Sequence, residues 1–292
     1  MSDYVLKTDH FNIYKGFVYS FVAIVLVSFD LNAQYSAMTY NIRYATDRDG
    51  INSWENRKEW VSDLINYYEP DVLGIQEGLI NQVRYLDQEL KSYEYVGVGR
   101  DDAGEKGEFS AIFYQEEKLL VLNSGTFWLS LTPDDPSYGW GANYRRICTW
   151  AEFEDISTNE RFLVFNTHFD HESEEARIES AKLIHQKVEG LNADDLPVLI
   201  MGDFNAIPMS EPYKLLSNHY YDSKSLTEKK AFGPDGTYNG FDTSHPLDVR
   251  IDYIFVSNKI GVEDYAVLSN SRGNRTPSDH LPVFINFNFS GR

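Results

Sequence analysis

Side chains that can bind a metal ion or a phosphate stand at the ends of apolar, strand-like segments throughout this 292-residue chain. They are Asn41, Glu77, His168, Asp203, Asn205, Asp252, Asp279 and His280. Loops and strand ends held by a rigid scaffold are common positions for binding and catalytic groups. We therefore expect these side chains to meet at one edge of a sheet scaffold.

These residue types suit one chemistry in particular. Asparagine and glutamate oxygens bind hard cations such as Mg²⁺, Mn²⁺ or Ca²⁺, whereas the sequence has neither a cysteine cluster nor an HExxH motif for zinc. A hard cation can polarise a phosphoryl oxygen and stabilise the leaving oxygen. A histidine oriented by a carboxylate can take a proton from water near neutral pH. The set predicts metal-assisted hydrolysis of a phosphoester.

Each group also has an ordinary structural interpretation. Glu77 could be an acid at a helix N-terminus, stabilised by the helix dipole, and His168 could be a core histidine with satisfied hydrogen bonds. The segment Gly202–Asn205 could be a simple turn, and Asp279 with His280 could cap another. The functional interpretation depends on finding all of these groups in one chain, each at a strand end.

The periodicity of apolar residues predicts the elements that must position these groups. Period-2 or continuous apolar runs predict strands, and apolar residues at helical spacing predict helices. Strands are expected at 35–44, 71–77, 197–204, 249–257 and 281–289, with others in a β-rich middle, and helices from about 53 to Pro70, at 79–90 and at 173–188. Since no repeat or long linker divides the chain, we expect one domain of two sheets flanked by helices.

The composition argues against a protein whose whole task is to bind long nucleic acid. The formal net charge is −19, whereas such proteins usually show basic patches. This field repels polyanions, but it leaves room for a small phosphorylated substrate held by a metal and a few local cations. The single cysteine, Cys148, lies in a strand-like segment and is expected to pack in the core.

The N-terminus has the features of a secretory signal peptide. Lys7 and Lys15 precede an apolar run from Phe17 to Phe29, which is short for a membrane span. We predict a signal peptide over residues 1–33, with a retained anchor as the alternative, and a catalytic domain over residues 34–292. The mature protein is then expected in the periplasm or outside the cell, without a stable membrane span.

Six sequence motifs occur in an order that identifies a family. They are TYNIR (39–43), LGIQE (73–77), NTHFD (166–170), MGDFN (201–205), RIDYIF (250–255) and SDHLPV (278–283). With them the chain resembles the endonuclease/exonuclease/phosphatase superfamily, which includes exonuclease III-like repair endonucleases, deoxyribonucleases, sphingomyelinases and inositol-polyphosphate 5-phosphatases. The resemblance implies an α/β fold, a four-layer α/β sandwich of two packed mixed β-sheets flanked by helices.

The resemblance also implies roles for particular residues. By the first two motifs, Asn41 and Glu77 hold a divalent cation, Mg²⁺ or Mn²⁺, with Asp279 close to it. By the later motifs, Asp203 and Asn205 approach the phosphate and the attacking water, and Asp252 orients His280. His280 is the leading general base, and Asp203 is the competing one.

Three further residues follow from particular branches of the family. His168 replaces the tyrosine of repair endonucleases and matches the histidine of the deoxyribonuclease and sphingomyelinase branches. Glu108 stands where deoxyribonucleases have a glutamate paired with that histidine, and Arg146 matches a phosphate-contacting arginine, which can grip a phosphate by paired hydrogen bonds. Arg146, Asn205 and His168 are thus the expected phosphate contacts. Glu108 and Arg146 could instead be surface charges on a sheet.

Family membership does not fix the substrate. The acidic charge and the leader favour an exported hydrolase (phosphodiesterase or phosphatase) that acts on a small-molecule or lipid-linked phosphate, and we expect a monomer. The alternative is an extracytoplasmic nuclease acting on DNA or RNA, and a third possibility is a binding module that has kept the fold. The segment 127–144 contains three aromatic residues, Tyr138, Trp140 and Tyr144, and is the expected specificity element. These aromatics could stack on a base or sugar, contact lipid, or cover the site.

Overall fold

The structure, a computed structural model, describes residues 1–2 and 34–289. The predicted signal peptide therefore lies outside the described residues, apart from its first two. No helix among the described residues is long and apolar enough to cross a membrane. From Gln34 onward, the described residues belong to one compact unit.

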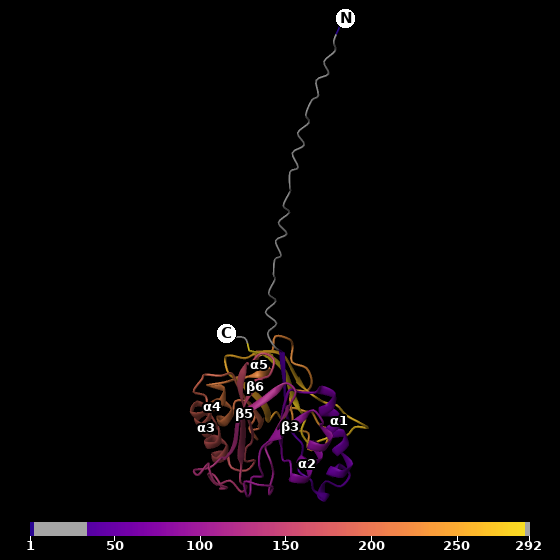
Figure 1. The fold of residues 1–292 in the computed structure, drawn as a ribbon. Helices are drawn as coiled ribbons and strands as arrows, with labels where there is room; N and C mark the ends of the chain where they lie inside the picture. The colour runs from indigo at the N-terminus through magenta and orange to yellow at the C-terminus, as the bar shows by residue number, and fades with distance from the viewer. Residues whose placement is uncertain (3–33, 290–292) are drawn as a thin grey trace. The chain divides into compact units, whose positions relative to one another are not determined.

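Two mixed sheets of six strands each form the centre of this unit (Figure 1). In spatial order, the first sheet contains β11 (Gly261–Val267), β12 (Val283–Asn288), β1 (Gln34–Asn41), β2 (Val72–Gln76), β4 (Ile112–Gln115) and β3 (Tyr93–Val96). The second contains β5 (Leu119–Trp128), β6 (Ile147–Asp155), β7 (Arg161–His168), β8 (Val198–Asp203), β10 (Asp252–Val256) and β9 (Tyr221–Asp222). The sheets pack face to face through a core of buried residues from both.

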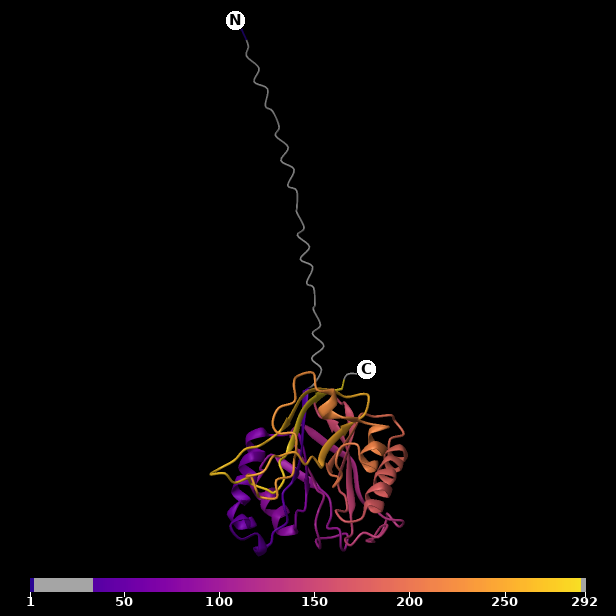
Figure 2. The ribbon, with the colours of Figure 1, turned by 180° about the vertical axis from the view of Figure 1, so that it is seen from behind.

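Helices cover the outer face of each sheet, as Figures 1 and 2 show from opposite sides. The longer helices are α1 (Lys58–Tyr68) and α2 (Ile80–Glu89) on the first sheet, and α3 (Glu174–Leu191) and α4 (Glu211–Ser217) on the second. Shorter helices are η1 (Asp47–Asn52), η2 (Trp54–Asn56) and α5 (Ser223–Leu226). Each helical layer has its own apolar cluster against its sheet. The predicted four-layer α/β sandwich is confirmed, and Cys148 is buried in one of these clusters as expected.

A buried polar contact joins the two sheets. Asn166 on β7 donates hydrogen bonds to the carbonyls of Ile75 (2.9 Å) and Ala111 (2.8 Å), and accepts one from Gln76 Nε2 (2.6 Å). The sheets approach closely here, since a Cβ at Gly74 would lie 2.7 Å from the Asn166 side chain. Glycine permits such an approach, and the contact fixes the second strand immediately before Glu77.

The sheet topology brings the motif residues to one edge. Parallel strands β1 and β2 end together, as do β7 and β8, in which His168 lies opposite Asp203. The antiparallel neighbours begin where these strands end: β10 starts at Asp252, opposite Asp203, and β12 starts three residues after His280, beside the end of β1. Strand ends from both sheets therefore supply the side chains of one site.

Among the boundaries that differ from the sequence predictions are those of the first strand and the first α-helix. The first strand ends at Asn41 rather than Tyr44, because Arg43 has a left-handed backbone (φ 56°) that no strand permits. The first α-helix begins at Lys58 rather than near Ser53, after two short 3₁₀ turns.

Arg57 is hydrogen-bonded to both of these irregular segments. Its buried guanidinium donates hydrogen bonds to the carbonyl of Ile42, to that of Arg43 (2.6 Å) and to that of Asn52 (2.9 Å). It also reaches the carbonyl of Pro277 at 3.3 Å. These bonds satisfy the carbonyls of an irregular segment, and they tie the chain after Asn41 to the chain before Asp279.

Candidate active site

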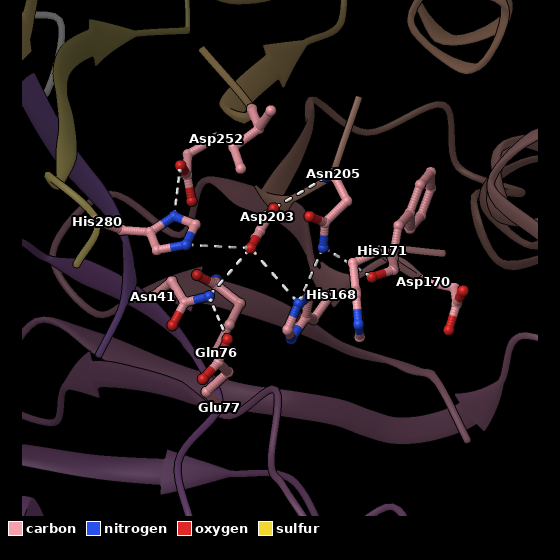
Figure 3. A network of polar contacts seen from close by, with 12 residues as sticks. Asn41, Gln76, Glu77, His168, Asp170, His171, Asp203, Asn205, Asp252 and His280 are labelled. Atoms are coloured by element: carbon pink, nitrogen blue, oxygen red, sulfur yellow. Dashed lines mark hydrogen bonds and ion pairs between the residues drawn. The ribbon is translucent and has the colours of Figure 1, made fainter. Parts of the chain in front are cut away.

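Asp203 lies at the centre of the site, between two histidines (Figure 3). Its Oδ2 is 3.7 Å from Nε2 of His280 and 3.4 Å from Nε2 of His168. The same oxygen accepts a hydrogen bond from Asn41 Nδ2 at 3.0 Å. Burial and the neighbouring Asp252 carboxylate raise the pKa of Asp203 to about 7. Asp203 can therefore hold or release a proton near neutral pH.

His280 forms a close pair with Asp252. Nδ1 of His280 is 2.9 Å from Oδ2 of Asp252, and both side chains are buried. Burial alone would lower the pKa of His280, but the carboxylates of Asp252 and Asp203 raise it well above its usual value. The geometry is that of a histidine oriented by a carboxylate, the arrangement expected for these two residues.

His168 has a looser carboxylate partner. Its Nδ1 is 3.9 Å from Oε2 of Glu108, and this carboxylate instead accepts a hydrogen bond of 2.6 Å from Arg100 Nη1. On the other side, Asn205 Nδ2 lies 3.2 Å from His168 Nε2. Burial, followed by the charges of Arg146 and Arg100, lowers the pKa of His168 well below its usual value. The two histidines flanking Asp203 are thus biased toward opposite charge states.

Three oxygen-bearing side chains gather beside this centre. Asn41 Nδ2 donates to Glu77 Oε1 at 3.0 Å, and Arg43 lies 3.8 Å from both Glu77 and Asp279. Burial raises the pKa of the Asp279 carboxyl, and Glu77 raises it further. Two carboxylates and an amide in close proximity form a donor set that fits a hard divalent cation.

A second group of possible ligands lies next to the first. One atom each from Asp203, Asp252 and His280 lies within 4.8 Å of the others, and all three residues are buried. Because His280 and Asp252 already form a close hydrogen-bonded pair, we regard this group as proton-handling and the Asn41, Glu77 and Asp279 group as the cation site.

Three residues of the site have left-handed backbones although none is glycine. Their φ angles are 56° at Arg43, 62° at Glu77 and 45° at Asn205, and each lies one or two residues beyond the end of a strand. Such backbones are uncommon for non-glycine residues and gather at functional sites. The backbone thus turns sharply just after each of these strands, at the residues that line the site.

These groups line a cleft of about 710 Å³ whose other wall carries arginines. Arg146 is buried there, which excludes the alternative that it is a surface charge; Glu108 is largely buried as well. Arg146 Nη2 is 2.9 Å from His171 Nδ1, and its Nη1 has no hydrogen-bond partner among the described residues. Arg146 is therefore held in the cleft with a donor group left over.

Each arginine around the cleft lies close to a carboxylate. The pairs are Arg43–Asp49 (3.0 Å), Arg100–Glu108 (2.6 Å), Arg145–Asp101 (3.3 Å) and Arg146–Asp170 (3.6 Å). The positive charges around the cleft are therefore largely balanced before any substrate arrives.

Several residues in or next to the cleft were not singled out from the sequence. Arg43 stands within the TYNIR motif and Asp170 within NTHFD, so position in a motif was an available signal. Arg100, His171 and Tyr238 come from irregular segments between strands, and only the fold brings them to the cleft. No periodicity or spacing in the sequence marks these three.

Comparisons with known proteins agree with the fold and the motifs. Residues 38–280 match the Endonuclease/Exonuclease/phosphatase family. The chain belongs to this family, whose members hydrolyse phosphoesters.

Individual relatives include a phosphatase and a nuclease. A mannosyl-6-phosphatase from Bacteroides thetaiotaomicron VPI-5482 has a structure that superposes with a TM-score of 0.84 at 37% identity, over 87% of this chain and 100% of that one. An uncharacterised protein of Acanthamoeba polyphaga mimivirus is 29% identical over 84% of this chain and 96% of its own length. The Ccr4 exoribonuclease subunit of the CCR4-Not complex from Mycosarcoma maydis is 23% identical over 87% of this chain, which spans only 50% of that relative.

Proposed function

We propose that this protein is an exported, divalent-metal-dependent phosphatase that hydrolyses a phosphate monoester carried by a small molecule, with sugar phosphates as the first class to test. The chemistry follows from the histidine–carboxylate pair and the cation ligands at one end of the cleft. The relative that acts on a mannosyl phosphate supports the choice of substrate class.

The charge balance of the cleft carries the proposal. A nuclease must hold the phosphates on both sides of the one it cleaves, and phosphate contacts by Lys and Arg dominate the affinity for nucleic acid. Here the arginines around the cleft already have carboxylates within 3.6 Å, and the formal net charge of the chain is −19. A single phosphate held by a cation and a few donors fits this arrangement better than a polyanionic strand.

The divalent cation would be held by Asn41, Glu77 and Asp279. When bound, it would supply a positive charge that polarises the phosphoryl group and stabilises the oxygen that leaves. Among the described residues, the carboxylates of Glu77 and Asp279 have only the half-buried guanidinium of Arg43 within 4 Å as a counter-charge, so a cation would relieve their mutual repulsion. Mg²⁺ and Mn²⁺ both suit these ligands.

The remaining residues would bind the phosphate and move protons. His280, oriented by the Asp252 carboxylate 2.9 Å from its Nδ1, would accept the proton of the attacking water through Nε2. Asp203, 3.7 Å from that Nε2, would lie beside His280 and the water. Asn205 and His168 would donate hydrogen bonds to phosphoryl oxygens. Arg146, with its unpartnered Nη1, would supply a further charge-assisted hydrogen bond.

The test is hydrolysis by the protein from about residue 34 onward, with Mg²⁺ or Mn²⁺. The substrates would be mannose 6-phosphate, other sugar phosphates, inositol phosphates, sphingomyelin, bis-p-nitrophenyl phosphate and plasmid DNA. We expect release of phosphate from a monoester and intact plasmid. Plasmid nicking that requires His280, with inert monoesters, would establish the nuclease instead.

Metal dependence is tested on the same preparation. EDTA should abolish hydrolysis, and Mg²⁺ or Mn²⁺ should restore it. Glu77→Gln should weaken Mn²⁺ binding, measured by calorimetry, at least about tenfold, because a charged ligand is replaced by a neutral one. Activity that persists in EDTA would remove the metal from the mechanism.

Export is tested in the native host or a bacterial expression host. The full-length protein should lose its first residues, and the mature form should be found in the periplasm or medium. Full-length protein retained in the cytoplasm would contradict this part of the proposal.

A further inference from the structure

Tyr144 forms part of the cleft wall, yet nothing in the catalytic chemistry requires it. Its side chain is 44% exposed. It immediately precedes the two adjacent arginines, Arg145 and Arg146, of which Arg146 also lines the cleft.

The ring of Tyr144 is held in place by three neighbours. The guanidinium of Arg100 lies 5.3 Å from its centroid, and that of Arg146 lies 5.8 Å away. His171 stacks on the ring at 5.7 Å with an interplanar angle of 26°. Cation–π and stacking contacts each favour a fixed ring position, so this exposed aromatic group is preorganised for binding.

The hydroxyl group of Tyr144 has no hydrogen-bond partner within the part of the chain that the structure describes. Beside it, the His171 ring is also about half exposed. The wall thus combines apolar ring surface with one hydroxyl group that remains available to a ligand, since both ring nitrogens of His171 already lie near Arg146 and Glu172. Ligand sites commonly combine aromatic surface with a few polar groups that fix orientation.

The wall lies on the side of the site where the leaving group is expected. Figure 3 shows His280 and His168 on opposite sides of Asp203, with His171 on the His168 side. Phosphoryl transfer places the attacking and leaving oxygens roughly in line. With water activated at His280, the leaving oxygen points toward His168, and the rest of the substrate extends to Tyr144.

The charge of this wall indicates the kind of group it binds. Its cations are balanced, since Arg100 is paired with Glu108 and Arg146 lies 3.6 Å from Asp170. A second phosphate or a carboxylate would find no unbalanced positive charge among these four groups. A neutral group with hydroxyls and an apolar ring face matches both the charge and the aromatic surface.

We propose that Tyr144, together with His171, binds the leaving group as a neutral sugar ring and thereby determines the specificity of the enzyme. This inference rests on the proposed phosphatase function. It assigns to the same cleft a subsite that binds the alcohol part of the substrate, the leaving group, rather than the phosphate.

The experiment compares two substrates in four forms of the enzyme. The substrates are mannose 6-phosphate and methyl phosphate, whose leaving group has no ring. The forms are wild type, Tyr144→Ala, Tyr144→Phe and Tyr138→Ala. Tyr138 is a matched control because it lies in the same loop, is 56% exposed and stacks on Arg145 at 4.5 Å, but does not line the cleft.

We expect Tyr144→Ala to lower kcat/KM for mannose 6-phosphate about 10- to 100-fold, as is usual for loss of one specificity contact, with less than about a threefold change for methyl phosphate. Tyr144→Phe should fall between this variant and wild type, and Tyr138→Ala should match wild type. An equal loss on both substrates, or no loss on either, would overturn the inference while leaving the phosphatase function intact. If wild type hydrolyses neither substrate but releases phosphate from another monoester of the panel, this inference fails and the phosphatase function stands; if it hydrolyses no monoester, both fail.

Discussion

The two histidines that flank Asp203 are the same residue type in the same cleft, yet their surroundings differ. His280 has a carboxylate 2.9 Å from its Nδ1, whereas the nearest carboxylate to Nδ1 of His168 is 3.9 Å away and is bound to Arg100. Carboxylates hold the pKa of His280 above its usual value, while burial and two arginines hold that of His168 below it. The neighbours, not the imidazole, set the charge.

This difference suggests a division of labour across the cleft. A histidine held by a buried carboxylate keeps a fixed tautomer and is suited to accept a proton from water and carry the resulting charge. A neutral histidine among arginines is suited to hydrogen-bond the phosphate or the leaving oxygen. Substitutions on the two sides of the cleft should therefore differ in their effects.

Loss of His280 should have the largest effect. His280→Ala should lower kcat about 10²- to 10⁴-fold, the usual contribution of a general base, with a melting temperature close to that of wild type. The matched control is His245→Ala, because His245 is a surface histidine whose side chain is 79% exposed. If His280→Ala retains near-normal turnover, the site assignment is wrong.

Removal of the carboxylate charge beside His280 should cause the second-largest loss of activity. Asp252→Asn keeps the shape of the side chain but removes the carboxylate that orients the ring at 2.9 Å, and we expect a loss of about 10²-fold in kcat. Pre-steady-state and steady-state rates of phosphate release would measure it. A loss of less than about threefold would mean that the pair is structural, because a charge-dependent general base would lose more.

Removal of the carboxylate charge beside His168 should reduce activity only slightly. Glu108→Gln should lower kcat less than about tenfold, because Glu108 is 3.9 Å from His168 and its closest contact is Arg100. It should lower the melting temperature instead, since it leaves the largely buried Arg100 without its ion pair. A loss as large as that of Asp252→Asn would show that the two histidine pairs are equivalent, contrary to the comparison.

Much of this arrangement could be predicted from the sequence because strands end at defined residues. The alternation in 281–289 and the apolar runs before Glu77 and Asp203 indicated the strands, and polar residues at their ends indicated a shared edge. Whether the strands would lie next to one another is a property of the sheet order, which local patterns do not contain. The family resemblance supplied that part.

The contrast between the histidines could not be predicted from the sequence. The contrast depends on whether the Glu108 side chain points toward His168 or toward Arg100, and on the position of the Arg146 side chain in the cleft. These positions follow from irregular segments between strands, where residue type and spacing do not fix the distance between side chains. The backbone turn at Arg43 depends likewise on long-range hydrogen bonds from Arg57.

The pKa shifts have opposite consequences for stability in the metal-free protein. Since folding raises the pKa of His280, its contribution to stability is present below about pH 6.5 and is lost as the pH rises through its folded-state pKa. Since folding lowers the pKa of His168, its contribution is present above about pH 6.5 and is lost as the pH falls through its folded-state pKa. Between these two pKa values, His280 of the metal-free protein is charged and His168 is neutral, so His280 can act as a base only once it has lost its proton.

The most direct test of this account is a pH titration of the histidine rings by NMR in the metal-free protein. The signals of the two rings would be assigned with His280→Ala and His168→Gln. We predict that the pKa of His280 lies above about 6.5, the usual value for histidine, and that the pKa of His168 lies below it. Two rings that titrate together near that pH would contradict the division of labour between them.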